Sequence, residues 1–94
     1  MKVVWTPVAE ADRHSIWMFL AEHSVVRADK VEARLRQRVN SLLGVPSQGH
    51  PVARGRRELS IPEIQLRVVY RIAEEENAIR ILRVRSTRQN REGP

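Results

Sequence analysis

The feature that most constrains this chain is the alternation of side chains along residues 64–72 (IQLRVVYRI). The apolar positions are Ile64, Leu66, Val68, Tyr70 and Ile72, and the positions between them hold Gln65, Arg67, Val69 and Arg71. A period of two predicts a β-strand with one buried face, because successive side chains of a strand point to opposite faces. We therefore expect a sheet with one face covered, Tyr70 included, and another face that carries cations.

Two shorter strands flank this segment. Residues 57–61 (RELSI) precede it across a turn at residues 62–63, and residues 78–85 (AIRILRVR) follow it across the polar turn 74–77. Short turns join antiparallel neighbours, so the three segments predict an antiparallel meander. A further strand is predicted at residues 2–6, where β-branched and aromatic residues come together.

Two amphipathic helices are predicted between the first strand and the meander. The first covers residues 8–23, because Thr6 and Pro7 favour a helix start. Its core-facing stripe consists of Ala9, Ile16, Phe19, Leu20 and His23. The second covers residues 28–43, and its core-facing stripe consists of Val31, Leu35, Val39 and Leu42. The short break at residues 24–27 indicates an antiparallel helical hairpin.

These elements predict an α+β fold in two layers, with an N-terminal strand, a two-helix hairpin and then a three-stranded antiparallel meander. The helices should cover one face of a mainly antiparallel four-stranded sheet and leave the other face open. A length of 94 residues fits one domain over residues 1–94. Residues 44–56 hold three of the four glycines and two prolines, and we expect a functional loop there.

Several classes of protein are excluded by composition. The chain has no cysteine, which excludes a disulfide scaffold, a thiol nucleophile and a thiolate metal site. We find no apolar run of membrane-spanning length and no signal-peptide pattern at the start, so we expect a cytoplasmic protein without membrane contact. His14, His23 and His50 are scattered and no glycine-rich phosphate loop is present, so we expect no metal and no cofactor.

Positive charge is concentrated in the second half of the chain. Lys and Arg number 17 against 11 Asp and Glu, for a net charge of +6, and ten arginines lie within residues 54–91. The planar guanidinium fork matches phosphate and carboxylate groups, so a polyanionic partner is indicated. The candidate binding residues, expected to gather in one cleft on the open sheet face, are Arg54, Arg56, Arg57, Arg67, Arg83, Arg85 and Arg88. The alternative is a solvated sheet face whose arginines pair with Glu58, Glu63 and the acidic turn.

The order of these segments resembles the RelE/ParE superfamily of bacterial toxins, and its details resemble the ParE branch. The residues that carry the resemblance are VVWTPVAEADRHSIWMFLAE, then Pro46 and Gly49 in the loop, then RELSIP, LRVVYRI and IRILRVRSTRQ in the family's order. The likeness spans nearly the whole chain. It implies a growth-inhibiting toxin of a type II toxin–antitoxin system, of the kind linked to plasmid stabilization. It also implies an acidic or amphipathic antitoxin that wraps around the toxin, and it leaves open a homo-oligomer.

The resemblance implies one of two targets. The ParE branch inhibits DNA gyrase by binding, and the RelE branch cuts mRNA on the ribosome. RNA cleavage needs a proton acceptor, a proton donor and cations around the phosphate. The RelE branch places a His or Tyr in the C-terminal stretch, whereas residues 85–90 (RSTRQN) hold neither, and ParE-like chains commonly carry a His near Ser86.

We therefore expect a gyrase inhibitor that acts by binding and is not an enzyme, with a RelE-like endoribonuclease as the alternative. In the alternative, the charge of the transition state would be stabilised by Arg57, Arg67, Arg83, Arg85 and Arg88. Glu58 is interpreted as the partner of a neighbouring arginine rather than a catalytic base. A plain nucleic-acid-binding module would need aromatic side chains on the open face, and the chain has only four aromatic residues.

Overall fold

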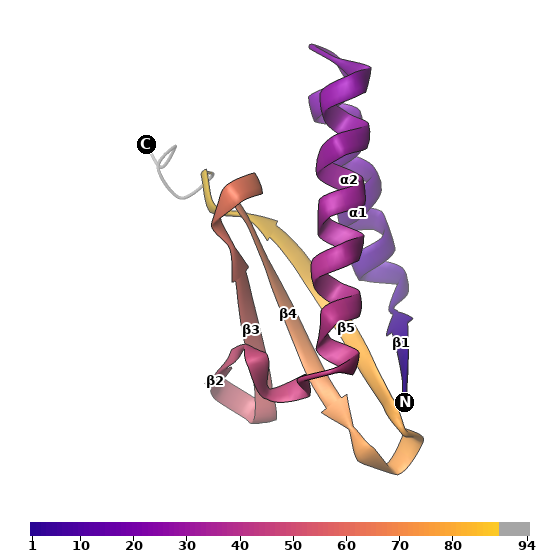
Figure 1. Cartoon of the computed structure of the whole chain (residues 1–94), viewed down its shortest axis with the longest axis vertical. Coiled ribbons are helices and arrows are strands. Elements are labelled where there is room, and N and C mark those ends of the chain that lie inside the picture. The colour runs from indigo at the N-terminus through magenta and orange to yellow at the C-terminus, as the bar shows by residue number, and fades with distance from the viewer. Residues whose placement is uncertain (89–94) are drawn as a thin grey trace.

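The computed structural model describes residues 1–88, which form one five-stranded sheet with two helices on one of its faces (Figure 1). The elements are β1 (Lys2–Trp5), α1 (Pro7–Ala21), α2 (Val25–Asn40), β2 (His50–Val52), β3 (Arg56–Ile61), β4 (Leu66–Ala73) and β5 (Ala78–Ser86). The strand order is β1-β5-β4-β3-β2. β1 runs parallel to β5, and the other neighbours are antiparallel. The predicted fold class is confirmed.

The sheet has five strands where the sequence pattern predicted four. The additional strand, β2, lies within the predicted loop 44–56 and pairs with β3 from His50–Glu58 to Val52–Arg56. Its central Pro51 is tolerated because β2 is an edge strand, where one row of backbone groups needs no partner. A strand of three residues is too short to show an alternation, so no sequence pattern indicated a strand here.

Both helices begin after a residue whose side chain caps the helix. The Thr6 hydroxyl accepts a hydrogen bond from the Ala9 N–H and α1 begins at Pro7, close to the predicted start. The Ser24 hydroxyl accepts one from the Arg27 N–H, so α2 begins at Val25, earlier than predicted. A cap of this type stabilises a helix by about 1 kcal/mol. The break between the helices is therefore shorter than the sequence pattern indicated.

The core lies between α2 and the central strands. All four residues of the predicted second core-facing stripe, Val31, Leu35, Val39 and Leu42, are buried, and Leu42 lies in the 3₁₀ turn Ser41–Leu43 that follows α2. The sheet residues of the same cluster are Leu59, Ile61, Leu66, Val68, Tyr70, Ile79, Ile81 and Val84. Tyr70 is fully buried, as predicted. Ile64 instead lies in a 3₁₀ turn, and Gln65 adopts a left-handed conformation (φ 57°), so β4 begins only at Leu66.

The end of the helical hairpin, residues 18–27, departs from the prediction and is called the hairpin tip below. Phe19 was assigned to the core-facing stripe of α1, but it is 60% exposed, and His23 is exposed as well. Figure 1 shows why: the hairpin extends past the end of the sheet, so the last turns of α1 and the first turns of α2 have no strands beside them. No helix within residues 1–88 is both long enough and apolar enough to cross a membrane.

Candidate functional site

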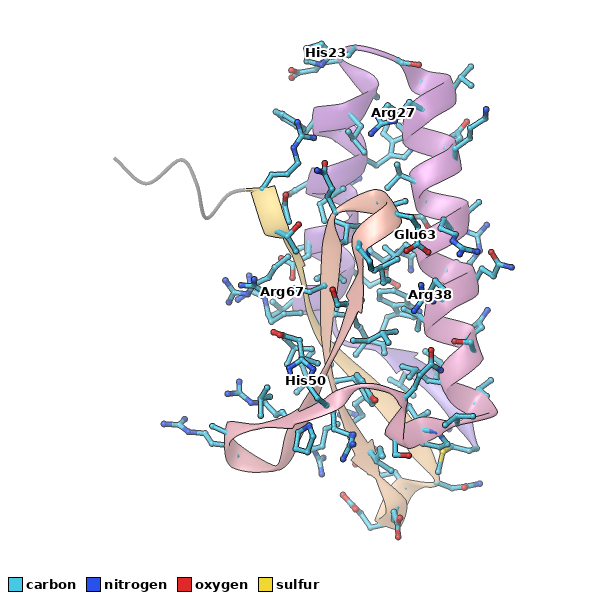
Figure 2. All side chains as sticks on the ribbon, turned by 60° about the vertical axis from the view of Figure 1, so that its left-hand side comes forward. His23, Arg27, Arg38, His50, Glu63 and Arg67 are labelled. Atoms are coloured by element: carbon cyan, nitrogen blue, oxygen red, sulfur yellow. The ribbon has the colours of Figure 1, made fainter. Side chains whose placement is uncertain are left out.

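The sheet face away from the helices, called the open face below, carries two pairs of arginines in register. Leu66, Val68 and Tyr70 of β4 belong to the core cluster with the helices, so Arg67 and Arg71, at the positions between and after them, point to the other side. Figure 2 shows Arg67 on the side of the sheet away from α2. The β4–β5 register places Arg67 opposite Arg85 and Arg71 opposite Arg80. Like charges directly opposite each other destabilise a sheet, so each pair requires an explanation.

One of the two pairs is compensated by the turn that joins its strands. A guanidinium nitrogen of Arg71 lies 3.5 Å from the Glu75 carboxylate. A guanidinium nitrogen of Arg80 lies 3.3 Å from the Glu76 carboxylate. Both glutamates belong to the acidic turn, so at this end of the open face the structure matches the alternative in which the arginines pair with that turn. The positive charge at this end of the open face is therefore balanced.

The other pair, Arg67 and Arg85, has less compensation. Arg85 is exposed, and within residues 1–88 it has no acidic partner. Arg67 has one acidic neighbour, Glu58 of β3, at 3.4 Å between Nε and Oε2. Glu58 thus partners an arginine, as predicted. The two guanidinium groups and one carboxylate leave a local excess of positive charge on the open face.

Glu58 is shared between Arg67 and a histidine. The Nε2 atom of His50 lies 3.7 Å from Glu58 Oε1. Both contacts are longer than a good hydrogen bond, and the buried Nε of Arg67 makes no hydrogen bond within the described residues. A buried donor without a partner is unfavourable. His50 was not among the predicted site residues, because its place on the open face depends on β2, which the sequence pattern did not reveal.

Arg83, a predicted site residue, is bound to helix α1. Its Nε lies 2.9 Å from Asp12 Oδ2 and its Nη2 lies 3.2 Å from Asp12 Oδ1. The same carboxylate accepts a hydrogen bond of 2.8 Å from the Val84 N–H. The hydrogen bond and the charge of Asp12 raise the pKa of the Arg83 guanidinium above its ordinary value. Arg83 thus joins α1 to the part of β5 that β1 does not cover.

Arg57, another predicted site residue, holds a loop. It is the register partner of Tyr70, so it lies on the covered face rather than on the open face. Its guanidinium donates to the carbonyls of Gly49 at 2.8 Å and Ser47 at 3.2 Å. The buried Tyr70 hydroxyl donates to the Pro46 carbonyl at 2.7 Å and accepts from the Gly49 N–H at 2.9 Å. We call these contacts of Arg57 and Tyr70 with residues 46–49 the loop clamp.

The remaining predicted arginines are dispersed. Arg54 is exposed in a turn with a left-handed backbone (φ 66°). Arg56 donates to the carbonyl of Ala53 at 3.0 Å. Arg88 lies beyond the end of β5, beside the helices. The expected single cleft of seven arginines is therefore not formed: the structure brings Arg67 and Arg85 together, because strand alternation and the turns direct the others elsewhere.

The alternative to an arginine cleft paired Glu63 with open-face arginines, whereas Glu63 pairs with α2. Its carboxylate lies 2.7 Å from Arg34 and 2.9 Å from Arg38. Figure 2 shows Glu63 and Arg38 facing each other between the β3–β4 turn and α2. A backbone hydrogen bond and the two arginines lower the pKa of Glu63. This contact fixes the β3–β4 turn against the helix.

A groove of about 370 Å³ lies between the hairpin tip and the adjacent end of the sheet. Its apolar lining comes from Ile16, Phe19, Leu20, Val31, Ile64 and Leu66. Two exposed arginines, Arg27 and Arg88, also line the groove, and neither has an acidic partner within residues 1–88. The groove thus offers an apolar floor between two cations. Its signal in the sequence was Phe19, which the pattern assigned to the core.

No three His, Asp or Glu side chains within residues 1–88 lie close enough together to hold a metal ion. The chemistry that the described residues offer is therefore contact through guanidinium groups, one His–Glu contact and an apolar groove.

Comparison with known proteins gives one family and several solved structures. The family described as "ParE toxin of type II toxin-antitoxin system, parDE" matches residues 3–91. A chain from the chromosomal ParDE toxin–antitoxin system of P. aeruginosa is 26% identical over 92% of this chain and 95% of that chain, with a TM-score of 0.79. Comparison with curated protein sequences gives no match.

Two further structures share the fold at lower identity. A chain of the RelBE2 toxin–antitoxin complex of Mycobacterium tuberculosis is 23% identical over 90% of this chain and 95% of that chain, with a TM-score of 0.70. The isolated E. coli RelE toxin is 13% identical over 96% of this chain and 92% of that chain, with a TM-score of 0.63.

Proposed function

This chain belongs to the ParE toxin family of type II toxin–antitoxin systems, and from that premise we propose that it inhibits DNA gyrase by binding and is neutralised by a cognate antitoxin. Gyrase acts on the chromosome, so the proposed place of action is the cytoplasm. The observation that carries the proposal is the pair Arg67 and Arg85 on the open face, which has one acidic neighbour within residues 1–88, Glu58. Such a surface suits a protein–DNA complex, because guanidinium groups bind phosphates and carboxylates with charge-assisted hydrogen bonds.

Gyrase is proposed rather than the ribosome because the family that matches residues 3–91 is the ParE toxin family. Residues 85–88 (RSTR) offer no histidine or tyrosine for proton transfer. We propose Arg67 and Arg85 as the residues of the predicted set that contact the target.

The antitoxin is proposed to occupy the groove at the hairpin tip. An apolar floor flanked by Arg27 and Arg88 fits an amphipathic helix with acidic residues beside its apolar face. Phe19 is the large aromatic side chain of this groove, and aromatic side chains contribute much of the binding energy in protein interfaces. Two of the similar structures come from toxin–antitoxin systems, which supports a partner of this kind.

One observation favours the alternative, a ribosome-dependent mRNA endonuclease. His50 lies beside Glu58 on the same face as Arg67, so the open face holds an imidazole that could carry a proton. The absence of a proton carrier was the reason to prefer gyrase at the level of sequence. The two functions therefore need separate assays.

A DNA supercoiling assay with purified gyrase tests the proposal. We expect the wild-type protein to inhibit supercoiling, and Arg67→Ala with Arg85→Ala to abolish the inhibition. Arg36→Ala is the matched control, since it removes one positive charge from α2 on the other side of the molecule. No inhibition by the wild-type protein at large excess would refute the gyrase target. Codon-positioned cuts in translated mRNA, mapped by primer extension, would establish the alternative.

A further inference from the structure

We propose that the open face is a binding site for the phosphodiester backbone of nucleic acids, in which Arg67 and Arg85 hold a phosphate and His50 makes the affinity rise as the pH falls. The inference deepens the proposed function, because it assigns this face to the DNA of the target complex rather than to the protein. Its test uses nucleic acid alone, so it can fail or succeed independently of gyrase.

The proposed phosphate site between Arg67 and Arg85, called the phosphate seat below, follows from the register of β4 and β5. Residues directly opposite on antiparallel strands have Cα atoms about 5 Å apart, so the side chains of Arg67 and Arg85 leave the sheet next to each other. A phosphate between two guanidinium forks accepts hydrogen bonds from both and removes the repulsion between them. The unfavourable pairing of like charges in the free protein thereby becomes a favourable interaction in the complex.

The charges around this seat limit it to one end of the open face. The acidic turn at residues 74–76 balances Arg71 and Arg80, and it repels a polyanion. Within residues 1–88, the end with Arg67 and Arg85 has one carboxylate in contact with them, Glu58. The net charge of +6 attracts a polyanion at long range.

Glu58 is the group through which His50 acts. With a neutral imidazole, the Glu58 carboxylate is drawn to Arg67, its neighbour at 3.4 Å, and competes with a bound phosphate. A proton on His50 provides Glu58 with a second cation at 3.7 Å, and Arg67 becomes available to the ligand. Among the described residues, the charged groups on the same face as His50 and near it are Glu58 on β3, which His50 contacts, and Arg67 on β4, which contacts the same carboxylate. Arg57, next to Glu58 on β3, lies on the covered face.

The direction of the pH dependence follows from linkage. Imidazoles gain their proton between about pH 8 and pH 5, where a phosphodiester stays anionic. Because protonation of His50 and phosphate binding favour each other, the affinity rises as the pH falls through that range. His50 is 63% exposed at its side chain, so protons and ligand both have access to it.

Fluorescence anisotropy with short labelled oligonucleotides tests the phosphate seat. We expect the wild-type protein to bind, and Arg67→Ala and Arg85→Ala each to weaken binding roughly tenfold and to lower the slope of log affinity against log salt by about 1. Arg36→Ala should keep most of the affinity. Arg85 is exposed, so Arg85→Ala keeps the test valid if Arg67→Ala does not fold. No binding by the wild type, or equal weakening in all three variants, would overturn the seat.

The same titration from about pH 8 to about pH 5 tests His50. We expect His50→Ala to lose the rise in affinity at low pH, and His14→Ala, on α1, to keep it. Glu58→Gln should bind more tightly than the wild type and with little pH dependence, because the competing carboxylate is gone. A pH profile that is identical in the wild type and His50→Ala would contradict the role of His50.

Separate arms with duplex DNA, single-stranded DNA and single-stranded RNA identify the source of the phosphodiester. Tightest binding to either form of DNA supports the inference. Tightest binding to RNA would overturn the assignment of the open face to DNA and would support the mRNA endonuclease instead. Supercoiling inhibition without DNA binding would overturn this inference and leave the proposed function standing. DNA binding without inhibition of supercoiling would support this inference and refute gyrase as the target.

Discussion

The loop clamp and the hairpin tip both connect elements of the fold. They differ in whether their side chains have partners within the described residues. In the loop clamp, the Tyr70 hydroxyl and the Arg57 guanidinium satisfy backbone groups of residues 46–49. At the hairpin tip, Phe19 and Val26 are exposed, and Arg27 has no acidic partner within residues 1–88. The polar groups of the loop clamp therefore have their hydrogen-bond partners within the chain itself. The hairpin tip presents the groups that a partner would cover, so mutations in the two regions should have different consequences.

The largest effect on stability is expected at Gly49. A Cβ atom there would lie 2.6 Å from the Glu58 carbonyl oxygen and 2.9 Å from the Tyr70 hydroxyl. Gly49→Ala should therefore lower the free energy of unfolding by about 3 kcal/mol, measured by urea denaturation. Gly44→Ala is the control, because a Cβ atom there would lie 3.6 Å from the Ser41 carbonyl oxygen, an ordinary contact. Equal effects of the two variants would show that the clamp does not depend on this close approach.

A smaller loss of stability is expected for Tyr70→Phe. The ring stays buried, but the Pro46 carbonyl and the Gly49 N–H lose their partner. We expect the free energy of unfolding to fall by about 2 kcal/mol, since buried polar groups left unpaired are costly. Amide hydrogen exchange should also become faster at Gly49 than in the centre of β4. An unchanged exchange rate at Gly49 would argue against the clamp.

Phe19→Ala tests the other side of the comparison. The free energy of unfolding should change by about 1 kcal/mol or less, because the side chain is 60% exposed. The affinity for the cognate antitoxin should fall by roughly thirtyfold, as expected for a large aromatic residue in an interface. Calorimetric titration of each variant with the antitoxin measures this affinity. An antitoxin that binds Phe19→Ala as tightly as the wild type would place the partner elsewhere.

The smallest effect is expected at Glu63, which fixes the β3–β4 turn to α2 through exposed charges. Its pKa is lowered in the folded protein, so its contribution to stability is present above the unfolded pKa and is lost as the pH falls through the folded pKa. Glu63→Gln should be less stable than the wild type near pH 7, and the difference should shrink in acid. Thermal unfolding at several pH values measures it, and a difference that grows in acid would contradict the assignment.

Much of the fold could be predicted because local patterns and packing agree. Thr6 and Pro7 marked the start of α1, and the spacing of Val31, Leu35 and Val39 identified the buried side of α2. The alternation of Leu66, Val68 and Tyr70 with Arg67 in the sequence identified the covered face and the open face, although Val69, at an open-face position, is buried as well. Helix α2 and strand β4 are long enough for their periodicity to be visible in the sequence, and Thr6 and Pro7 form a local helix-start signal.

The rest depends on contacts between distant residues. β2 has three residues and is held in place by Tyr70, so His50 could not be placed beside Glu58 from the sequence. Phe19 fits a helical stripe, and its exposure depends on how far the helices extend past the sheet. Asp12 could not be paired with Arg83, 71 positions later, from any local pattern.

The pairing of β1 with β5 has a consequence during synthesis. Lys2 is in register with Ala78 and Trp5 with Ile81, and the Thr6 hydroxyl donates to the Ile81 carbonyl 75 positions along the chain. Strand β1 can therefore pair only after residues 78–81 have been synthesised and have left the ribosome. Chains that end before residue 78 lack this partner strand, so the sheet cannot close in them.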